Sequence, residues 1–129
     1  SKALKEKKTH DTWEQGLIQI FYEIRENKPF IMNVYRCVSR ERVERYLNPL
    51  TDDLVMGVVE EQSAGMSVRD EDKQFIAKIY AYILVGVMLD WICDDMKEEP
   101  EQLVERLALA IQGNISSALE RFRTDKRRA

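Results

Sequence analysis

The chain has 129 residues, of which 44% are hydrophobic and 33% charged. This composition supports one domain with a buried core, and it excludes two domains of ordinary size as well as intrinsic disorder. With 20 basic and 23 acidic residues the net charge is -3, which lacks the positive excess of a stand-alone nucleic-acid-binding domain.

The first half of the chain predicts three short helices. Asp11 and Glu14 have the spacing of an N-terminal capping box, so we expect a helix over residues 12–26. Pro29 suits the first turn of a second helix, which continues the apolar period to residue 38. Ser39 can cap a third segment over residues 40–47, which Asn48-Pro49 is expected to end.

The second half predicts three more helices. The first follows Thr51 and closes at Gly65. A second capping box, Ser67 with Asp70, precedes the longest apolar pattern of the chain, residues 75–92. Pro100 opens the last pattern, which runs to residue 122. The sequence therefore predicts an all-α domain of about six helices, because the β-branched residues follow helical rather than alternating periods.

Few residues could support catalysis or bind a metal. His10 is the one histidine, in a polar segment where we expect it to be exposed. Cys37 and Cys93 lie in separate apolar runs and are expected to be reduced core thiols. The acids of residues 94–99 lack the ligand spacing of a calcium loop and are expected to be a solvated face. We expect no catalytic residues, no metal and no cofactor.

The sequence also gives expectations about location. The segment 1–8 is charged without an apolar centre, so it is not a signal peptide. The most apolar stretch, residues 79–89, is shorter than the roughly 20 residues needed to cross a bilayer. A cytoplasmic protein without a membrane span is therefore expected.

Residues 79–89 are apolar around the whole helix circumference rather than along one stripe. One core cannot cover every face, so we expect a homodimer in which this helix and the final one form a four-helix interface about a two-fold axis. The alternative is a fully buried helix in a monomeric bundle. Gly86 is a candidate point of close helix crossing, with room for a ligand as the alternative. The residues expected on the dimer side are Gly86, Met88, Trp91, Leu107 and Ile111.

Aromatic and methionine residues at helical spacing are first of all core residues. Buried tyrosine hydroxyls need partners, however, and tyrosines beside adaptable methionines are typical of apolar ligand pockets with a few polar groups. The residues expected to line such a pocket are Phe21, Met32, Tyr35, Tyr80 and Tyr82.

Two segments carry a resemblance to a known family. Residues 26–35 contain E-N-K-P-F between two helices, and residues 86–100 contain the pattern G-x-x-x-x-W-x-x-x-x-M-K-x-x-P. Together with the helical pattern over residues 12–122, they resemble the C-terminal regulatory domain of TetR/AcrR-type transcriptional regulators. Within that family they most resemble the branch that contains the dihydroxyacetone kinase regulators.

The resemblance implies a domain that binds a small effector between its helices and dimerises through its last two long helices. Such regulators begin with a helix-turn-helix module of about 45 to 50 residues. On this interpretation residues 1–11 are the remnant of a connector to a missing DNA-binding module, and residues 12–129 are the ligand-binding and dimerisation domain. DNA would be contacted only through that module. The alternative is a helical protein-protein adaptor without a small-molecule site.

Overall fold

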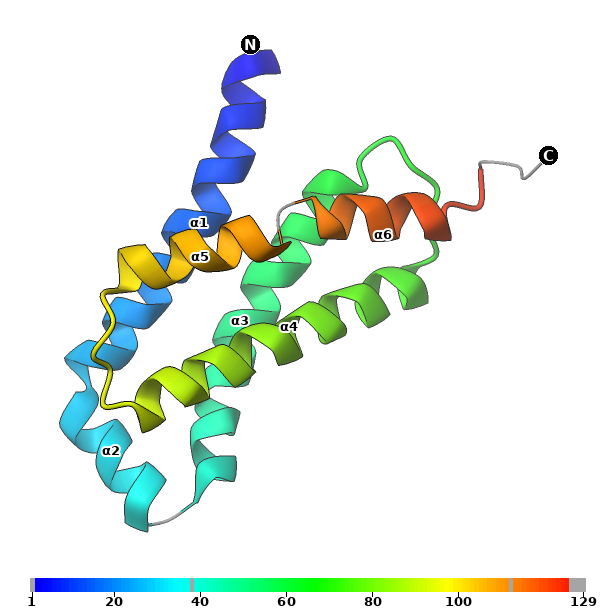
Figure 1. Ribbon diagram of the computed structural model, residues 1–129. Helices are drawn as coiled ribbons and strands as arrows, with labels where there is room; N and C mark the ends of the chain where they lie inside the picture. The colour runs from blue at the N-terminus through cyan, green and yellow to red at the C-terminus, as the bar shows by residue number, and fades with distance from the viewer. Residues whose placement is uncertain (1, 38, 112, 126–129) are drawn as a thin grey trace.

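The computed structural model describes residues 2–37, 39–111 and 113–125, with side chains described from residue 13 onward except that of Cys37. Within these residues the chain is all-helical, with six helices and no strand (Figure 1). The all-α prediction is confirmed. The helices are α1 (Lys2–Glu26), α2 (Lys28–Cys37), α3 (Arg40–Gln62), α4 (Asp70–Cys93), α5 (Pro100–Ile111) and α6 (Asn114–Phe122).

Helix α1 begins at Lys2 rather than near Thr12, so the predicted capping box at Asp11 is wrong. The segment before it is rich in Lys, Ala, Leu and Glu, which are strong helix formers, and nothing in it ends a helix. Residues 2–11 therefore continue α1 without a break. The side chain of His10, which the sequence places in solvent, lies outside the described side chains.

Helix α3 runs through Pro49, where the sequence predicts a helix end. Ser39 caps its first turn as expected, since its Oγ accepts a hydrogen bond from the Arg42 amide at 3.1 Å. One buried face continues across the proline and holds the two halves as a single helix: Val43, Leu47, Thr51, Val55, Val58 and Val59. Packing thus overrides the local signal of Asn48-Pro49.

Two further helix boundaries differ from the prediction. The residue that caps α4 is Arg69, without a side-chain hydrogen bond, so the predicted box at Ser67 is wrong. The last apolar pattern is divided at Gly113, whose φ of 81° places it in the left-handed region that favours glycine. The final two helices, α5 and α6, are consequently 12 and 9 residues long. The one long helix of this half is α4.

The core lies where α3 and α4 cross, which is the most extensive contact between helices (Figure 1). Helix α1 packs on α3 and α5, and α6 covers α3 and α4 near the other end. Fully buried side chains come from all six helices, among them Phe21, Ile31, Leu47, Met88, Val104 and Leu119.

Helix α4 is long enough and apolar enough to cross a membrane, by length and composition alone. Half of its most apolar stretch is buried inside the domain. The rest of its apolar surface faces outward.

Candidate functional site

One small cavity opens between α1, α3, α4 and the junction of α5 with α6. Its volume is about 40 Å³, room for a few water molecules, and one side is open to solvent. Its lining is mostly apolar: Trp13, Leu54, Val55, Val58, Gln62, Tyr80, Leu84, Ile111, Gly113 and Ile115.

Two glycines shape this cavity. At Gly16 the helices α1 and α3 approach so closely that an added Cβ would lie 2.9 Å from Leu54 Cδ1. Gly113 provides the left-handed turn that starts α6, and α6 then supplies Ile115 to the lining. The wall therefore depends on one close helix approach and one tight turn.

Gln62, the last residue of α3, and Tyr80 are the two residues of the wall with a polar side-chain group, and Gln62 is the one with an unpaired atom. Its Oε1 is buried and has no hydrogen-bond partner, and it is the sole such side-chain atom in the part of the chain whose side chains are described. A buried acceptor without a donor costs free energy, and because this atom exposes almost no surface the cost falls on the stability of the fold.

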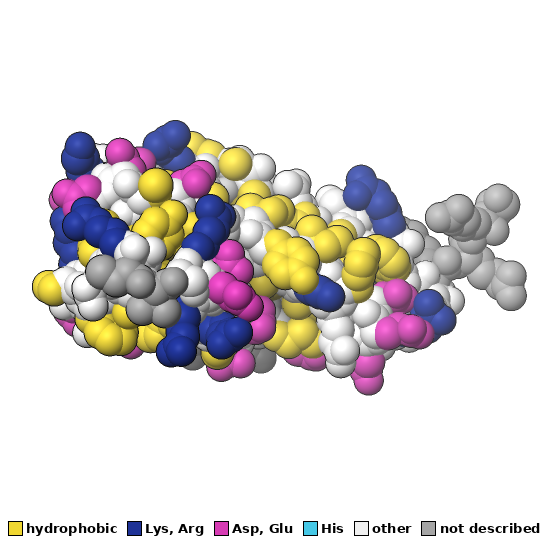
Figure 2. Space-filling view, turned by 90° about the horizontal axis from the view of Figure 1, so that it is seen from below, with side chains coloured by type: hydrophobic (Ala, Val, Ile, Leu, Met, Phe, Trp, Pro, Cys, Tyr) yellow, Lys and Arg dark blue, Asp and Glu magenta, His cyan; other side chains and the backbone are white. Residues whose placement is uncertain are grey.

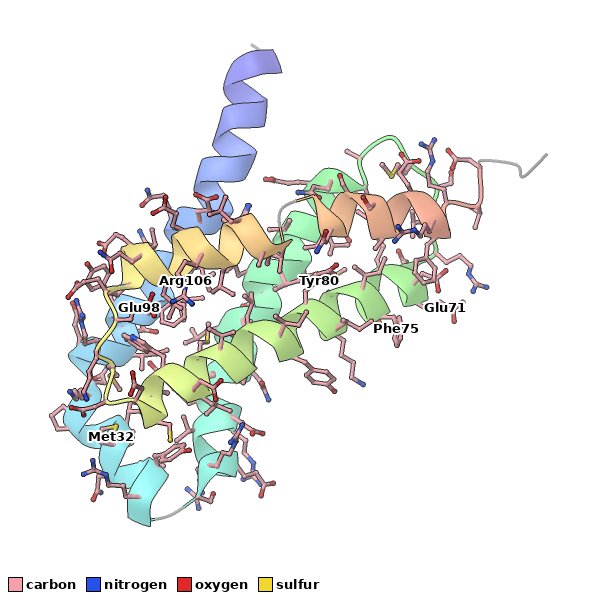
Figure 3. All side chains as sticks on the ribbon, viewed as in Figure 1. Met32, Glu71, Phe75, Tyr80, Glu98 and Arg106 are labelled. Atoms are coloured by element: carbon pink, nitrogen blue, oxygen red, sulfur yellow. The ribbon has the colours of Figure 1, made fainter. Side chains whose placement is uncertain are left out.

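Of the five residues predicted to line a pocket, Tyr80 lines the cavity, and it projects from α4 on the side of α6 (Figure 3). Phe21 is fully buried in the core, where its ring meets Trp91 edge to face at a centroid distance of 4.9 Å. Met32 is buried in α2 beside a separate shallow groove and lies far from Tyr80 in Figure 3.

The remaining two predicted pocket residues also lie elsewhere. Tyr82 is 62% exposed on the outer face of α4. Tyr35 shares a hydrogen bond with the side chain of Cys93, which raises the pKa of the tyrosine. Cys93 itself is an exposed free thiol, so its predicted place in the core is wrong, whereas the side chain of Cys37 is not described. The structure does not bring the five together, because helix rotation decides which face a residue occupies.

The residues predicted for the dimer side do not lie on one surface. Met88, Trp91 and Leu107 are buried within one chain, and Ile111 lines the cavity. Gly86 lies on the partly exposed side of α4, and nothing in the described chain comes within 4 Å of the position of its missing Cβ. Among the described residues, no other helix therefore comes into close contact at Gly86.

The apolar surface that one chain leaves uncovered on α4 comprises Phe75, Ile79, Tyr82 and Ile83, which are 54, 40, 62 and 40% exposed. We call these four residues the α4 row. Phe75 points outward from the helix in Figure 3, and Figure 2 shows apolar side chains gathered along this face. The spacing of three and four residues places the row on one side of the helix, and Gly86 continues it one turn further.

The acids after α4, predicted as a solvated face, have basic partners. Asp95 pairs with Lys28 at 3.0 Å, and this contact holds the pKa of Asp95 below its usual value. Arg25 pairs with Glu99 at 3.2 Å, and the Trp91 indole donates to the Glu98 carbonyl at 2.8 Å. No group of three potential metal ligands occurs among the described residues. These ion pairs hold the loop between α4 and α5 against α1 and α2.

Two further polar side-chain contacts lie at the same end of the molecule. The Tyr22 hydroxyl hydrogen-bonds the Glu101 carboxylate, which raises the pKa of the tyrosine and lowers that of the acid. Glu98 pairs with Arg106 at 2.8 Å, and both are labelled in Figure 3. These groups have structural partners and form no site of converging catalytic residues.

Comparison with known proteins agrees with this architecture. Residues 11–113 match the family described as the transcriptional regulator C-terminal region, of the TetR type. Neither the curated proteins nor the solved structures give a match. The family match does not reach to the dihydroxyacetone kinase branch, which stays an expectation. Because the match covers most of the chain, this protein belongs to the family of TetR-type transcriptional regulator C-terminal domains.

Proposed function

We propose that this domain binds a small effector in the cavity and passes the binding event through α1 to a DNA-binding module. The observation that carries the proposal is that α1 contributes Trp13 to the cavity wall and is continuous from Lys2 to Glu26. Regulators of this family act as dimers that bind DNA and small effectors. Residues 1–11 would serve as the connector, and the role would be regulatory rather than catalytic, in the cytoplasm where operator DNA lies.

In this proposal the α4 row packs against the α4 row of a second copy of the chain. In an antiparallel pairing centred between Tyr82 and Ile83, Ile79 of each chain would face Gly86 of the other. The Ile79 side chain of one chain would then fill the space beside Gly86, which has no side chain, in the other. The same contact would occur twice, as a two-fold axis requires. In this interface, exposed residues of α4 take the place of Met88, Trp91 and Leu107, which are buried within one chain.

An effector would act by favouring one dimer arrangement. A ligand shifts such an equilibrium only by its difference in affinity for the two arrangements. Helices α1 and α3 are in close contact at Gly16, so there is no free space between them. A molecule that binds against Trp13 or Leu54 would therefore have to displace α1. The separation of two DNA-binding modules attached to α1 would change accordingly.

Sedimentation of the purified chain tests the dimer. We expect a dimer for the wild type and a monomer for Ile79→Glu, because the substitution would bury a charge against Gly86 on both sides of the two-fold axis. Phe30→Glu is the matched control, since Phe30 is 65% exposed on α2, outside the row. A wild-type monomer at micromolar concentration would contradict the proposed interface.

A thermal-shift screen of small metabolites tests effector binding. A true effector raises the melting temperature in a concentration-dependent way, because it binds the folded state alone. A dimer that no compound stabilises would instead favour the adaptor function, in which the cavity is an imperfection of packing.

A further inference from the structure

Two exposed charges of opposite sign lie on the outer face of α4, one toward each end of the α4 row. After its acidic first turn, the helix has three charged residues, Lys73, Lys78 and Asp90. Lys73 pairs with Glu60 of α3 at 3.6 Å, within the chain. Lys78 and Asp90 are both exposed. This face of α4 therefore presents one cation and one anion beyond the first turn.

Both charges are placed where a second chain would meet them. The ammonium nitrogen of Lys78 lies 5.8 Å from the centroid of the Tyr82 ring, so the cation is at the edge of the row. Asp90 follows Gly86 by four residues and continues the same face by one more turn. Among the described side chains, none forms an ion pair or a hydrogen bond with the Asp90 carboxylate.

The antiparallel pairing proposed above determines which charges meet. With Ile79 opposite Gly86, Lys78 lies opposite Val87 of the other chain. Asp90 of that chain is three residues further, about 4.5 Å along the helix axis, which a lysine side chain can span. The two-fold axis repeats the contact. A parallel pairing would instead bring like charges together, Lys78 to Lys78 and Asp90 to Asp90.

The same register gives Asp90 a need for this cation. Phe75 of one chain would lie opposite Asp90 of the other, and its ring would displace water from the carboxylate. Arg69, the other cation near this end of α4, is already paired with Glu71 at 3.3 Å and with Asp72 at 3.1 Å. Lys78 is the remaining cation of the helix that can compensate the carboxylate.

We infer that Lys78 of each chain forms an ion pair with Asp90 of the other, and that the two pairs fix the direction and register of the dimer. The inference rests on the proposed function and specifies its partner, a chain whose α4 carries the complementary charges. Exposed ion pairs add little affinity, whereas like charges in the same places are unfavourable. The pairs therefore act on the choice of partner.

Reversal of each charge tests the inference. Lys78→Glu would bring two carboxylates together at both contacts, and Asp90→Lys would bring two ammonium groups together. We expect each variant alone to form a dimer about tenfold weaker than the wild type at low salt, measured by sedimentation. An equimolar mixture should form heterodimers in preference to either homodimer, because the mixed pair alone has opposite charges at both contacts. Native mass spectrometry measures the heterodimer when one variant carries a heavy-isotope label.

Matched controls separate this effect from a change in net charge or in folding. Arg42→Glu and Glu61→Lys make the same changes in charge at exposed positions of α3, outside the row. They should keep the wild-type affinity and mix at random. The double variant Lys78→Glu with Asp90→Lys should recover the wild-type affinity, because the exchanged charges are again opposite.

The outcomes distinguish the ion pairs from the dimer itself. A wild-type dimer whose affinity neither single reversal changes would overturn the ion pairs and leave the apolar interface. Weaker single variants that mix at random would also overturn them, because the two charges would then act separately. A wild-type monomer would overturn the proposed interface together with the inference.

Discussion

The two halves of α4 are packed in different ways. At its C-terminal end Trp91 meets Phe21 edge to face, its indole N–H is bonded, and ion pairs hold the following loop to α1 and α2. In its middle Tyr80 and Leu84 line a cavity, and Gln62 of the same wall carries a buried acceptor without a partner. We call these the closed end and the open part. The closed end fixes the helices to one another, so a ligand can change the structure at the open part alone.

The closed end is built from a specific turn. The Met96 amide donates to the Trp91 carbonyl at 2.8 Å, and Asp95 and Met96 both have positive φ, 63° and 55°. This is the arrangement of a Schellman-type helix end, made here without glycine. The strain of two left-handed residues is offset by the burial of Met96 and by the Lys28 pair of Asp95.

The largest effect is expected from breaking the closed end. Phe21→Ala should lower the free energy of unfolding by about 3 to 5 kcal/mol, because it leaves a cavity against Trp91. Phe30→Ala, at an exposed phenylalanine, should change it by less than about 0.5 kcal/mol. Urea denaturation measures both, and similar losses in the two variants would contradict the distinction.

The open part should respond in the opposite direction. Gln62→Leu is expected to raise the free energy of unfolding of the ligand-free chain by about 1 to 3 kcal/mol, because it removes a buried acceptor that has no partner. The same urea series measures the change. Destabilisation by this substitution would contradict the assignment of an unpaired acceptor and mean that the Gln62 amide supports the fold.

A pair of glycine substitutions sharpens the comparison. Gly57→Ala should stabilise α3 by about 0.5 to 1 kcal/mol, since nothing lies within 4 Å of the added Cβ. Gly16→Ala should gain less, because Leu54 Cδ1 has to move from 2.9 Å, and it should weaken effector binding by displacing Leu54 in the cavity wall. Calorimetry measures the two gains in stability, and titration with a compound from the metabolite screen measures binding. Equal gains with unchanged binding would contradict the role of Gly16.

The smallest effect concerns the end of α6. Asp125 is bonded to Arg123, which lowers the pKa of the carboxyl to about 2. A depressed pKa contributes stability that is present above the ordinary value near 4 and is lost as the pH falls through about 2. Carboxyl NMR should show the pKa of Asp125 returning toward its usual value in Arg123→Gln. An unchanged value in the variant would exclude the arginine as the cause.

The sequence predicted the helical class because apolar periodicity repeats along most of the chain. It missed the continuity of α3 through Pro49, since a local breaker was outweighed by a buried face that only the folded structure shows. It also joined α5 to α6, although Gly113 was visible, because an isolated glycine is tolerated in many helices.

The candidate site was less predictable. The apolar circumference of α4 correctly indicated an excess of apolar surface, yet its rotation placed Met88 and Trp91 in the core and the α4 row outside. Tyr80 was expected to line a pocket because tyrosine combines an apolar ring with a polar group, and it lies in the cavity wall. Gln62 was missed because an isolated glutamine near a helix end gives no signal in sequence, and its importance comes from burial without a partner.

Amide hydrogen exchange along α4 tests most directly whether its two halves differ. We predict faster exchange for residues 80–87 than for residues 88–92. A compound that raises the melting temperature in the metabolite screen should slow the first group alone, because a ligand can stabilise only the part that it contacts. Uniform exchange along the helix, unchanged by such a compound, would contradict the distinction between the closed end and the open part.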